Sequence, residues 1–216
     1  MNKWIMAGTA AAFTGAAAFA RSEYERTHLD IVHYDIKTDK LGLEWNGFKA
    51  VFLSDLHDNS FGMENEELLA AIEKEQPDIV VIGGDMLVVK EWAAPHFDML
   101  ANLYRKLVKR YPVYYAFGNH EQRMKEEPLT YPGWWQSYWK VLKDSGMHVL
   151  VNKSEEIIKN GTAMRISGIT LPRECYRKGR IPSLSAGYID KKIGKASDKN
   201  FELLLAHTPT LSLIHI

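Results

Sequence analysis

The sequence contains almost no cysteine: Cys175 is the only one among 216 residues. A single cysteine excludes a disulfide within the chain, and it excludes metal sites that are built from several cysteine thiolates. Any metal ion bound by this chain would therefore be held by histidine, carboxylate or amide side chains.

The chain also lacks an excess of charge of either sign, because 27 Lys and Arg residues balance 27 Asp and Glu residues. No overall field draws the protein toward nucleic acid, so no nucleic-acid partner is expected. Internal repeats are missing, and so is the G-x-G-x-x-G motif of dinucleotide-binding proteins. The length and the 46% hydrophobic content fit one globular domain with a sizeable core.

Charged residues are absent from Trp4 to Ala20, near the N-terminus. We expect residues 1–22 to form a membrane anchor, because this run has about the minimum length that spans a bilayer. A cleaved signal peptide is the alternative, because Ala18, Phe19 and Ala20 fit the small-x-small cleavage pattern. The first interpretation predicts a protein anchored in the cell membrane, and the second predicts a secreted one.

Apolar runs and amphipathic stretches alternate along the rest of the chain, which predicts an α/β fold with parallel early strands. Residues 171–200 are expected to be irregular. Strands are predicted within residues 30–37, 48–54, 78–85, 111–121, 147–170 and 200–209, and helices within 63–76, 95–110 and 133–146.

Polar side chains follow four of these apolar strands, in the segments "SDLH", "GGD", "GNHE" and "AHTP". Asp55 and His57 are two residues apart, so on an extended backbone they would point the same way. Taken alone, "SDLH" fits a metal site, an acid–base pair or a polar loop in which Asp55 caps a helix. Because the carboxyl ends of parallel strands meet at one edge, we expect six side chains to gather there: Asp55, His57, Asp85, Asn119, His120 and His207.

The donor atoms in this set are oxygen and imidazole nitrogen, without sulfur. Such a set favours Mn, Fe or Zn over Mg or Ca alone.

The order D-L-H, G-D, G-N-H-E and a later lone histidine resembles the calcineurin-like metallophosphoesterases. That family carries D-x-H, G-D, G-N-H-D/E, H and finally G-H-x-H, and the resemblance covers residues 48–210. It implies a sandwich of two mixed β-sheets flanked by helices. It also implies a phosphoester hydrolase, of phosphodiesterase or pyrophosphatase type, that uses two divalent metal ions and a metal-activated hydroxide.

Matched position by position, the resemblance implies five metal ligands. Asp55 and His57 would bind the first ion, and Asp85 would bridge both ions. Asn119 and His207 would bind the second ion.

The resemblance also implies two catalytic residues that do not bind metal. His120 would face the leaving oxygen of the substrate. Glu121 would orient His120 or support its charged form.

The final family motif, G-H-x-H, does not follow His207. We therefore expect the phosphoesterase domain to occupy residues 23–216 and to lack its last strands. The last six residues, "LSLIHI", can be encoded by a transposon end sequence used in sequencing libraries, so residues 211–216 are expected to be foreign to the domain.

An anchor followed by these motifs resembles a bacterial branch of the family that acts on UDP-2,3-diacylglucosamine or related lipid-linked pyrophosphates. A lipid-linked phosphoester is therefore the expected substrate class. The alternative from another functional class is a non-catalytic, membrane-tethered binding module that keeps the fold.

Overall fold

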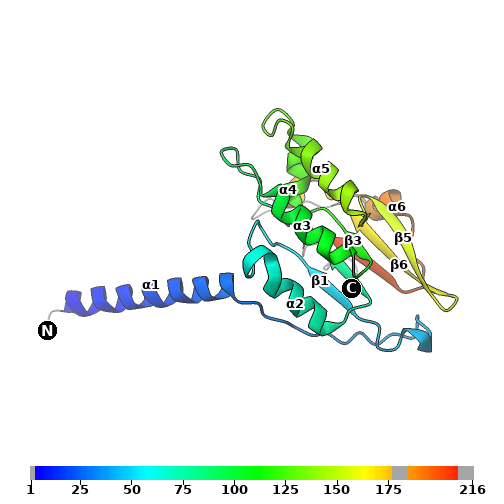
Figure 1. Cartoon of the computed structure of the whole chain (residues 1–216), viewed down its shortest axis with the longest axis horizontal. Coiled ribbons are helices and arrows are strands. Elements are labelled where there is room, and N and C mark those ends of the chain that lie inside the picture. The colour runs from blue at the N-terminus through cyan, green and yellow to red at the C-terminus, as the bar shows by residue number, and fades with distance from the viewer. Residues whose placement is uncertain (1–2, 177–183, 209–216) are drawn as a thin grey trace.

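The computed structural model describes residues 3–176 and 184–208, with side chains described from residue 14 onward. Helix α1 (Lys3–Thr27) extends away from the rest of the molecule (Figure 1). None of the helices in the described ranges combines the length and the apolar character that crossing a bilayer requires. Anchoring by residues 1–22 stays a prediction.

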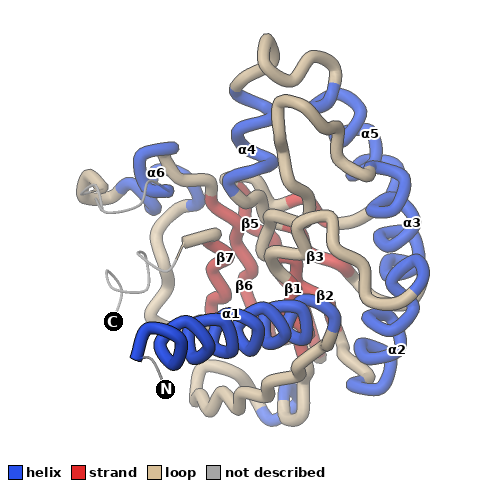
Figure 2. Tube along the Cα trace, turned by 90° about the vertical axis from the view of Figure 1, so that its left-hand side faces the viewer, coloured by secondary structure: helices blue, strands red, loops and turns tan. Residues whose placement is uncertain are grey.

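Two β-sheets form the centre of the molecule (Figure 2). The first sheet has the order β1-β2-β3-β4, and each of its described pairs is parallel. Its strands are β1 (Ala50–Leu53), β2 (Ile79–Ile82), β3 (Val113–Tyr115) and β4 (His148–Val149). The second has the order β5-β6-β7, namely β5 (Lys153–Lys159), β6 (Thr162–Ile169) and β7 (Glu202–Ala206). In it β5 runs antiparallel and β7 parallel to β6. The α/β prediction is confirmed, although only the second sheet is mixed.

Three helices cover one face of the first sheet: α2 (Glu66–Glu75), α3 (Phe97–Val108) and α5 (Trp134–Ser145). Val80 and Ile82 of β2 face these helices, whereas Ile79 and Val81 face the second sheet. This alternation follows from the two-residue period of a strand, and it explains why β2 is apolar throughout. The short helix α6 (Tyr188–Ile193) packs on the far face of the second sheet.

The predicted helices are confirmed, with bounds that are shorter by a few residues. The segment before α2 is the 3-10 helix η2 (Met63–Asn65), and two further 3-10 turns occur as η1 (Leu43–Trp45) and η3 (Arg173–Tyr176). Two helices were not predicted: α6, which lies in the stretch expected to be irregular, and α4 (Asn119–Glu126), which begins inside "GNHE".

The predicted strand at residues 30–37 is wrong, because this segment forms no strand. Its alternating apolar side chains remain in solvent: Val32 is 62% exposed, Tyr34 84% and Ile36 71%. Alternation produces a strand only when a neighbouring strand pairs with it and one face is buried. The expectation for residues 211–216 lies outside the described residues.

Candidate metal centre

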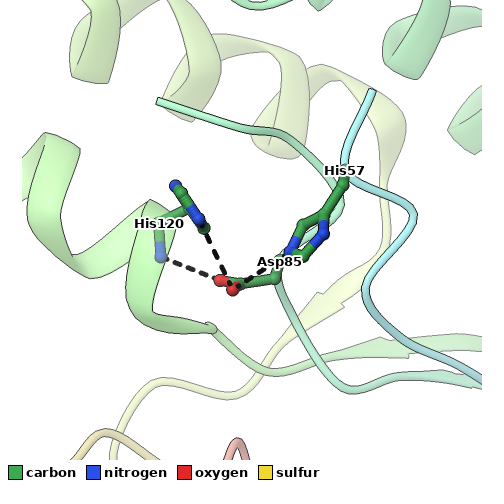
Figure 3. Close-up of side chains that lie close together, drawn as sticks. All are labelled: His57, Asp85 and His120. Atoms are coloured by element: carbon green, nitrogen blue, oxygen red, sulfur yellow. Dashed lines mark hydrogen bonds and ion pairs between the residues drawn. The ribbon is translucent and has the colours of Figure 1, made fainter. Parts of the chain in front are cut away.

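The carboxyl ends of β1, β2, β3 and β7 bring the predicted side chains together around Asp85. Its carboxylate oxygen Oδ2 lies 3.1 Å from His207 Nε2 and 3.4 Å from His57 Nε2. Asp55 closes the cluster, with its Oδ1 atom 3.7 Å from His207 Nε2 and 3.6 Å from His57 Nε2. Figure 3 shows His57 and His120 converging on Asp85 from two sides.

Two groups of potential metal ligands share Asp85. One comprises His57, Asp85 and His120, and the other comprises Asp55, Asp85 and His207. Within each group the donor atoms lie within 4.8 Å of one another. The imidazole nitrogens of both groups approach the same oxygen, Asp85 Oδ2, so the geometry fits a carboxylate oxygen shared by two cations about 3.5–4 Å apart.

The side-chain amide of Asn119 also faces Asp85. With the amide nitrogen toward Asp85, it donates a 3.1 Å hydrogen bond to Asp85 Oδ2, and the amide oxygen accepts a 3.2 Å hydrogen bond from the N–H of His120. Asn119 is therefore close enough to Asp85 to take part in the same site, and its role as a ligand stays a prediction.

The backbone adopts the left-handed conformation at four acidic or histidine positions of the site. The φ angles are 56° at Asp55, 52° at His57, 58° at Asp58 and 50° at Asp85. Asp55 and His57 therefore converge through a tight turn, and the prediction of an extended backbone between them is wrong. Such conformations are uncommon outside glycine and cost of order 1–3 kcal/mol each, so surrounding contacts must hold them.

One such contact comes from Asp58, whose Oδ2 atom accepts a hydrogen bond of 2.9 Å from the backbone N–H of Val88. Asp58 thus ties the loop after β1 to the loop after β2.

Glycine is required where the loops after β2 and β3 touch. A Cβ atom on Gly84, whose φ is +99°, would lie 2.0 Å from the backbone nitrogen of Gly118. A Cβ atom on Gly118 would lie 2.1 Å from Asp85 Oδ1. The two glycines therefore allow the backbone of α4 to reach Asp85, where the N–H of His120 donates a 2.8 Å hydrogen bond to Oδ1.

Asp85 and His207 each stabilise the charged form of the other side chain. Burial alone would raise the pKa of Asp85, but hydrogen bonds from His207 and from the His120 N–H outweigh it and lower that pKa. Burial likewise lowers the pKa of His207, and the hydrogen bond and charge of Asp85 reverse this effect and raise it. A carboxylate that stays ionised in a buried place is suited to accept a cation.

Glu121 does not orient His120, contrary to the prediction. Its carboxylate is fully buried and accepts hydrogen bonds from the backbone N–H groups of Asp85, Met86 and Gly118 at 3.0, 3.1 and 3.0 Å. Burial and the nearby charge of Asp85 raise the pKa of Glu121 to about 7. Glu121 therefore fixes the loop that carries Asp85.

A chain of buried tyrosines continues this network into the helical layer. Tyr115 donates to Glu121 at 2.7 Å, and its hydroxyl also lies 2.6 Å from that of Tyr138. The Tyr138 hydroxyl lies 2.8 Å from that of Tyr104. Burial raises the pKa of all three tyrosines, so they remain protonated donors. The sequence offered no signal for this network, because tyrosines in apolar segments read as core residues.

The imidazole of His120 is oriented by backbone instead. The N–H of Val89 donates a 3.0 Å hydrogen bond to His120 Nδ1, so the neutral ring carries its proton on Nε2. Nε2 lies 3.9 Å from Asp85 Oδ2, on the side of the ring that faces the site. Burial lowers the pKa of His120, which favours this neutral form.

The donor set fits divalent metal ions. Each group combines carboxylate oxygens and imidazole nitrogens, the Asn119 side chain lies beside them, and no cysteine among the described residues belongs to either group.

Comparison with known proteins also supports a metal site of this kind. The family model for calcineurin-like phosphoesterases matches residues 48–215. The uncharacterized metallophosphoesterase YkoQ of Bacillus subtilis (strain 168) is 28% identical over 161 residues, covering 74% of this chain and 53% of YkoQ. The uncharacterized protein YpbG of the same strain is 21% identical over 160 residues, covering 74% of this chain and 52% of YpbG.

The chain thus spans about half the length of these two curated relatives. The family model covers most of the chain and includes each residue of the cluster around Asp85. The chain belongs to the calcineurin-like phosphoesterase family.

Proposed function

We propose that this protein hydrolyses phosphoesters with two divalent metal ions bound around Asp85. The observation that carries the proposal is the position of the Asp85 carboxylate, which two groups of candidate ligands share at the carboxyl edge of the sheets. Membership of the family and the similarity to the metallophosphoesterase YkoQ support the same reaction class.

The proposed pairs of ligands follow the family pattern, whereas the observed groups place Asp55 with His207 and His57 with His120. Asp55 and His57 would hold one ion, and Asn119 and His207 would hold the other. When bound, the ions would polarise a water molecule for attack on phosphorus and neutralise charge on the phosphoryl oxygens. Asn119 is neutral, so it would hold an ion without adding negative charge against an anionic substrate.

His120 would act on the leaving group. The N–H of Val89 occupies its Nδ1 atom, so the Nε2–H is free to donate a hydrogen bond toward a departing alkoxide oxygen. The 16% exposure of this side chain leaves it within reach of a substrate while most of the ring is held by packing.

The proposal also extends to the identity of the metal and to the class of substrate. Imidazole and oxygen donors without sulfur favour Mn, Fe or Zn. We further propose a lipid-linked phosphoester such as UDP-2,3-diacylglucosamine, with residues 1–22 placing the enzyme at the cell membrane. The uncharged run from Trp4 to Ala20 supports this placement, and secretion is the second choice.

Two measurements on one preparation test the reaction class. The protein is loaded with Mn²⁺, and hydrolysis of bis-para-nitrophenyl phosphate is compared with that of para-nitrophenyl phosphate. We expect metal-dependent release of nitrophenol that chelation abolishes and added Mn²⁺ restores. Metal-loaded protein that hydrolyses neither compound would favour the non-catalytic binding module.

A further inference from the structure

Residues 88–96 form a loop between the Asp85 turn and helix α3. The start of this loop reaches the candidate metal centre, because the N–H of Val89 donates its 3.0 Å hydrogen bond to His120 Nδ1. The side chain of Val89 is 3% exposed, whereas residues 90–94 are exposed and form a tight turn. The loop thus has an exposed tip and a base that contacts the imidazole.

The Asp58 carboxylate joins the two ends of this loop. Its Oδ2 atom accepts a hydrogen bond of 2.9 Å from the Val88 N–H, and its Oδ1 atom accepts a longer one of 3.4 Å from the His96 N–H. The backbone of Asp58 is itself fixed, because its N–H donates to the Met86 carbonyl at 3.1 Å. One side chain therefore holds the base of the loop against the turn after β1.

A carboxylate is suited to this task because it accepts hydrogen bonds at both of its oxygens. An asparagine would offer one oxygen, and its NH₂ group would face the second N–H as another donor. Asp58 belongs to neither group of potential metal ligands. Its two oxygens serve the loop, although it directly follows His57.

The tautomer of His120 depends on the base of the loop. The hydrogen bond at one ring nitrogen decides which nitrogen carries the proton. Val88 and Val89 are consecutive, so the bond that holds the Val88 N–H also limits the movement of the Val89 N–H. The Arg123 guanidinium lies 3.3 Å from the same Nδ1 atom, but it ends a long side chain with several rotatable bonds.

We infer that Asp58 is a positioning residue for His120. By holding both ends of the loop, it keeps the Val89 N–H on His120 Nδ1, so the proton of the neutral ring stays on Nε2. The inference rests on the proposed function in one respect, namely that the Nε2–H acts on the leaving group. The orientation of the ring can be measured before any metal is added.

Nitrogen-15 NMR of the histidine rings in metal-free protein tests this inference. Spectra are recorded at pH of about 8, above the ordinary imidazole pKa of about 6.5, and the His120 signals are those missing from His120→Gln. We expect the Nε2–H tautomer in the unmodified protein and a mixture of tautomers in Asp58→Ala. Asp58→Asn leaves one acceptor and should shift the mixture less.

Hydrogen exchange of the Val89 amide, measured on the same samples, reports on the loop directly. We expect this amide to exchange at least about tenfold faster in Asp58→Ala, because the base of the loop opens more often. If Asp58→Ala does not fold, Asp58→Asn decides the question through both readings. An unchanged tautomer and an unchanged Val89 exchange rate in the folded variant would overturn the inference.

The matched control is Asp78→Ala. Asp78 is also an aspartate that accepts a backbone N–H, with its Oδ2 atom 2.8 Å from the nitrogen of Lys49. The pair joins the segments before β1 and β2, at the opposite end of these strands from the metal centre. Asp78→Ala should therefore leave the His120 tautomer and the Val89 exchange rate unchanged, even where it lowers stability.

Arg123→Met tests the other donor to the same nitrogen. We expect it to retain the Nε2–H tautomer, because the Val89 N–H remains in place. Loss of that tautomer in Arg123→Met but not in the Asp58 variants would assign the orientation of His120 to Arg123 and overturn the inference.

Turnover separates this inference from the proposed function. In Mn²⁺-loaded protein, Asp58→Ala should lower kcat at least about tenfold for diphenyl phosphate, a part of the 10²–10⁴-fold that a positioned proton donor contributes. The loss should be smaller for bis-para-nitrophenyl phosphate, whose leaving group needs a proton less, and equal losses on the two esters would overturn the inference.

The two ideas can also fail one at a time. A tautomer shift in Asp58→Ala, in a protein that hydrolyses neither ester even before substitution, would keep the positioning role and reject the hydrolase. Hydrolysis of both esters with a His120 tautomer that ignores Asp58 would reject the positioning role and keep the hydrolase.

Discussion

The two sides of the candidate metal centre differ in how the protein holds them. The side chain of Asp85 is 3% exposed, whereas those of Asp55 and His57 are 52% and 43% exposed. Asp85 sits on a loop whose N–H groups are bonded to buried Glu121, while Asp55 and His57 lie at the rim after β1. The buried side is organised by the protein itself, and the exposed side would gain its order from a bound ion.

This difference predicts that changes on the buried side affect both activity and stability, whereas changes at the rim affect metal binding, and through it activity, but not stability. The following variants test that division, from the largest expected effect to the smallest.

Asp85→Asn should have the largest effect on activity. The substitution keeps the shape of the side chain but removes the charge that would serve both ions. We expect a loss of more than about 100-fold in hydrolysis of bis-para-nitrophenyl phosphate, beyond the 10–100-fold typical of residues that only orient ligands. His57→Ala and Asn119→Asp should lose less. Near-normal turnover in Asp85→Asn would remove the two-ion assignment.

Glu121→Ala should have the largest effect on stability. It leaves three buried backbone N–H groups and the Tyr115 hydroxyl without their acceptor. Each unsatisfied buried group costs about 1–3 kcal/mol, so the free energy of unfolding should fall by about 3 kcal/mol or more.

Urea denaturation measures this change, and Glu156→Ala on the exposed face of β5 is the control. The control should shift the free energy of unfolding by less than about 0.5 kcal/mol. If both variants unfold alike, then Glu121 does not hold the Asp85 loop.

Tyr138→Phe should have a smaller effect, because it removes only the middle hydroxyl of the tyrosine chain. Tyr104 and Tyr115 would each lose a buried hydrogen bond, at a cost of about 1–2 kcal/mol in the free energy of unfolding. Tyr34→Phe, at a position that is 84% exposed, is the matched control and should change nothing measurable. An unchanged free energy of unfolding in Tyr138→Phe would show that the chain of hydroxyls adds nothing to stability.

The convergence of the candidate ligands was predictable from the sequence because each follows a continuous apolar strand. Asp55, Asp85 and Asn119 come after the parallel strands β1, β2 and β3, which bring them to one edge of the first sheet, and His207 reaches the same place from β7 of the second sheet. The positions of these strand ends can be predicted without knowing any side-chain contact. The same reasoning predicted the α/β layers.

The partners of Glu121 were not predictable in this way. Glu121 binds the backbone of Asp85, which lies 36 residues earlier, and no local pattern encodes which distant N–H group a carboxylate will reach. Arg123 and Arg173 line one polar pocket beside α4. Neither residue belongs to a motif, so this pocket could not be predicted from the sequence. The strand predicted at residues 30–37 does not form for a related reason, because strand pairing depends on neighbours in space.

Metal stoichiometry tests the central claim most directly. The protein is saturated with Mn²⁺, freed of excess ion by gel filtration, and analysed by inductively coupled plasma mass spectrometry. His33→Ala serves as the control for His57→Ala, because His33 is an exposed histidine that pairs with Glu75 away from the site. We predict two ions per chain in the unmodified protein and in His33→Ala, close to one in His57→Ala, and close to none in Asp85→Asn. Two ions retained by Asp85→Asn, or only one ion in the unmodified protein, would contradict the shared role of Asp85.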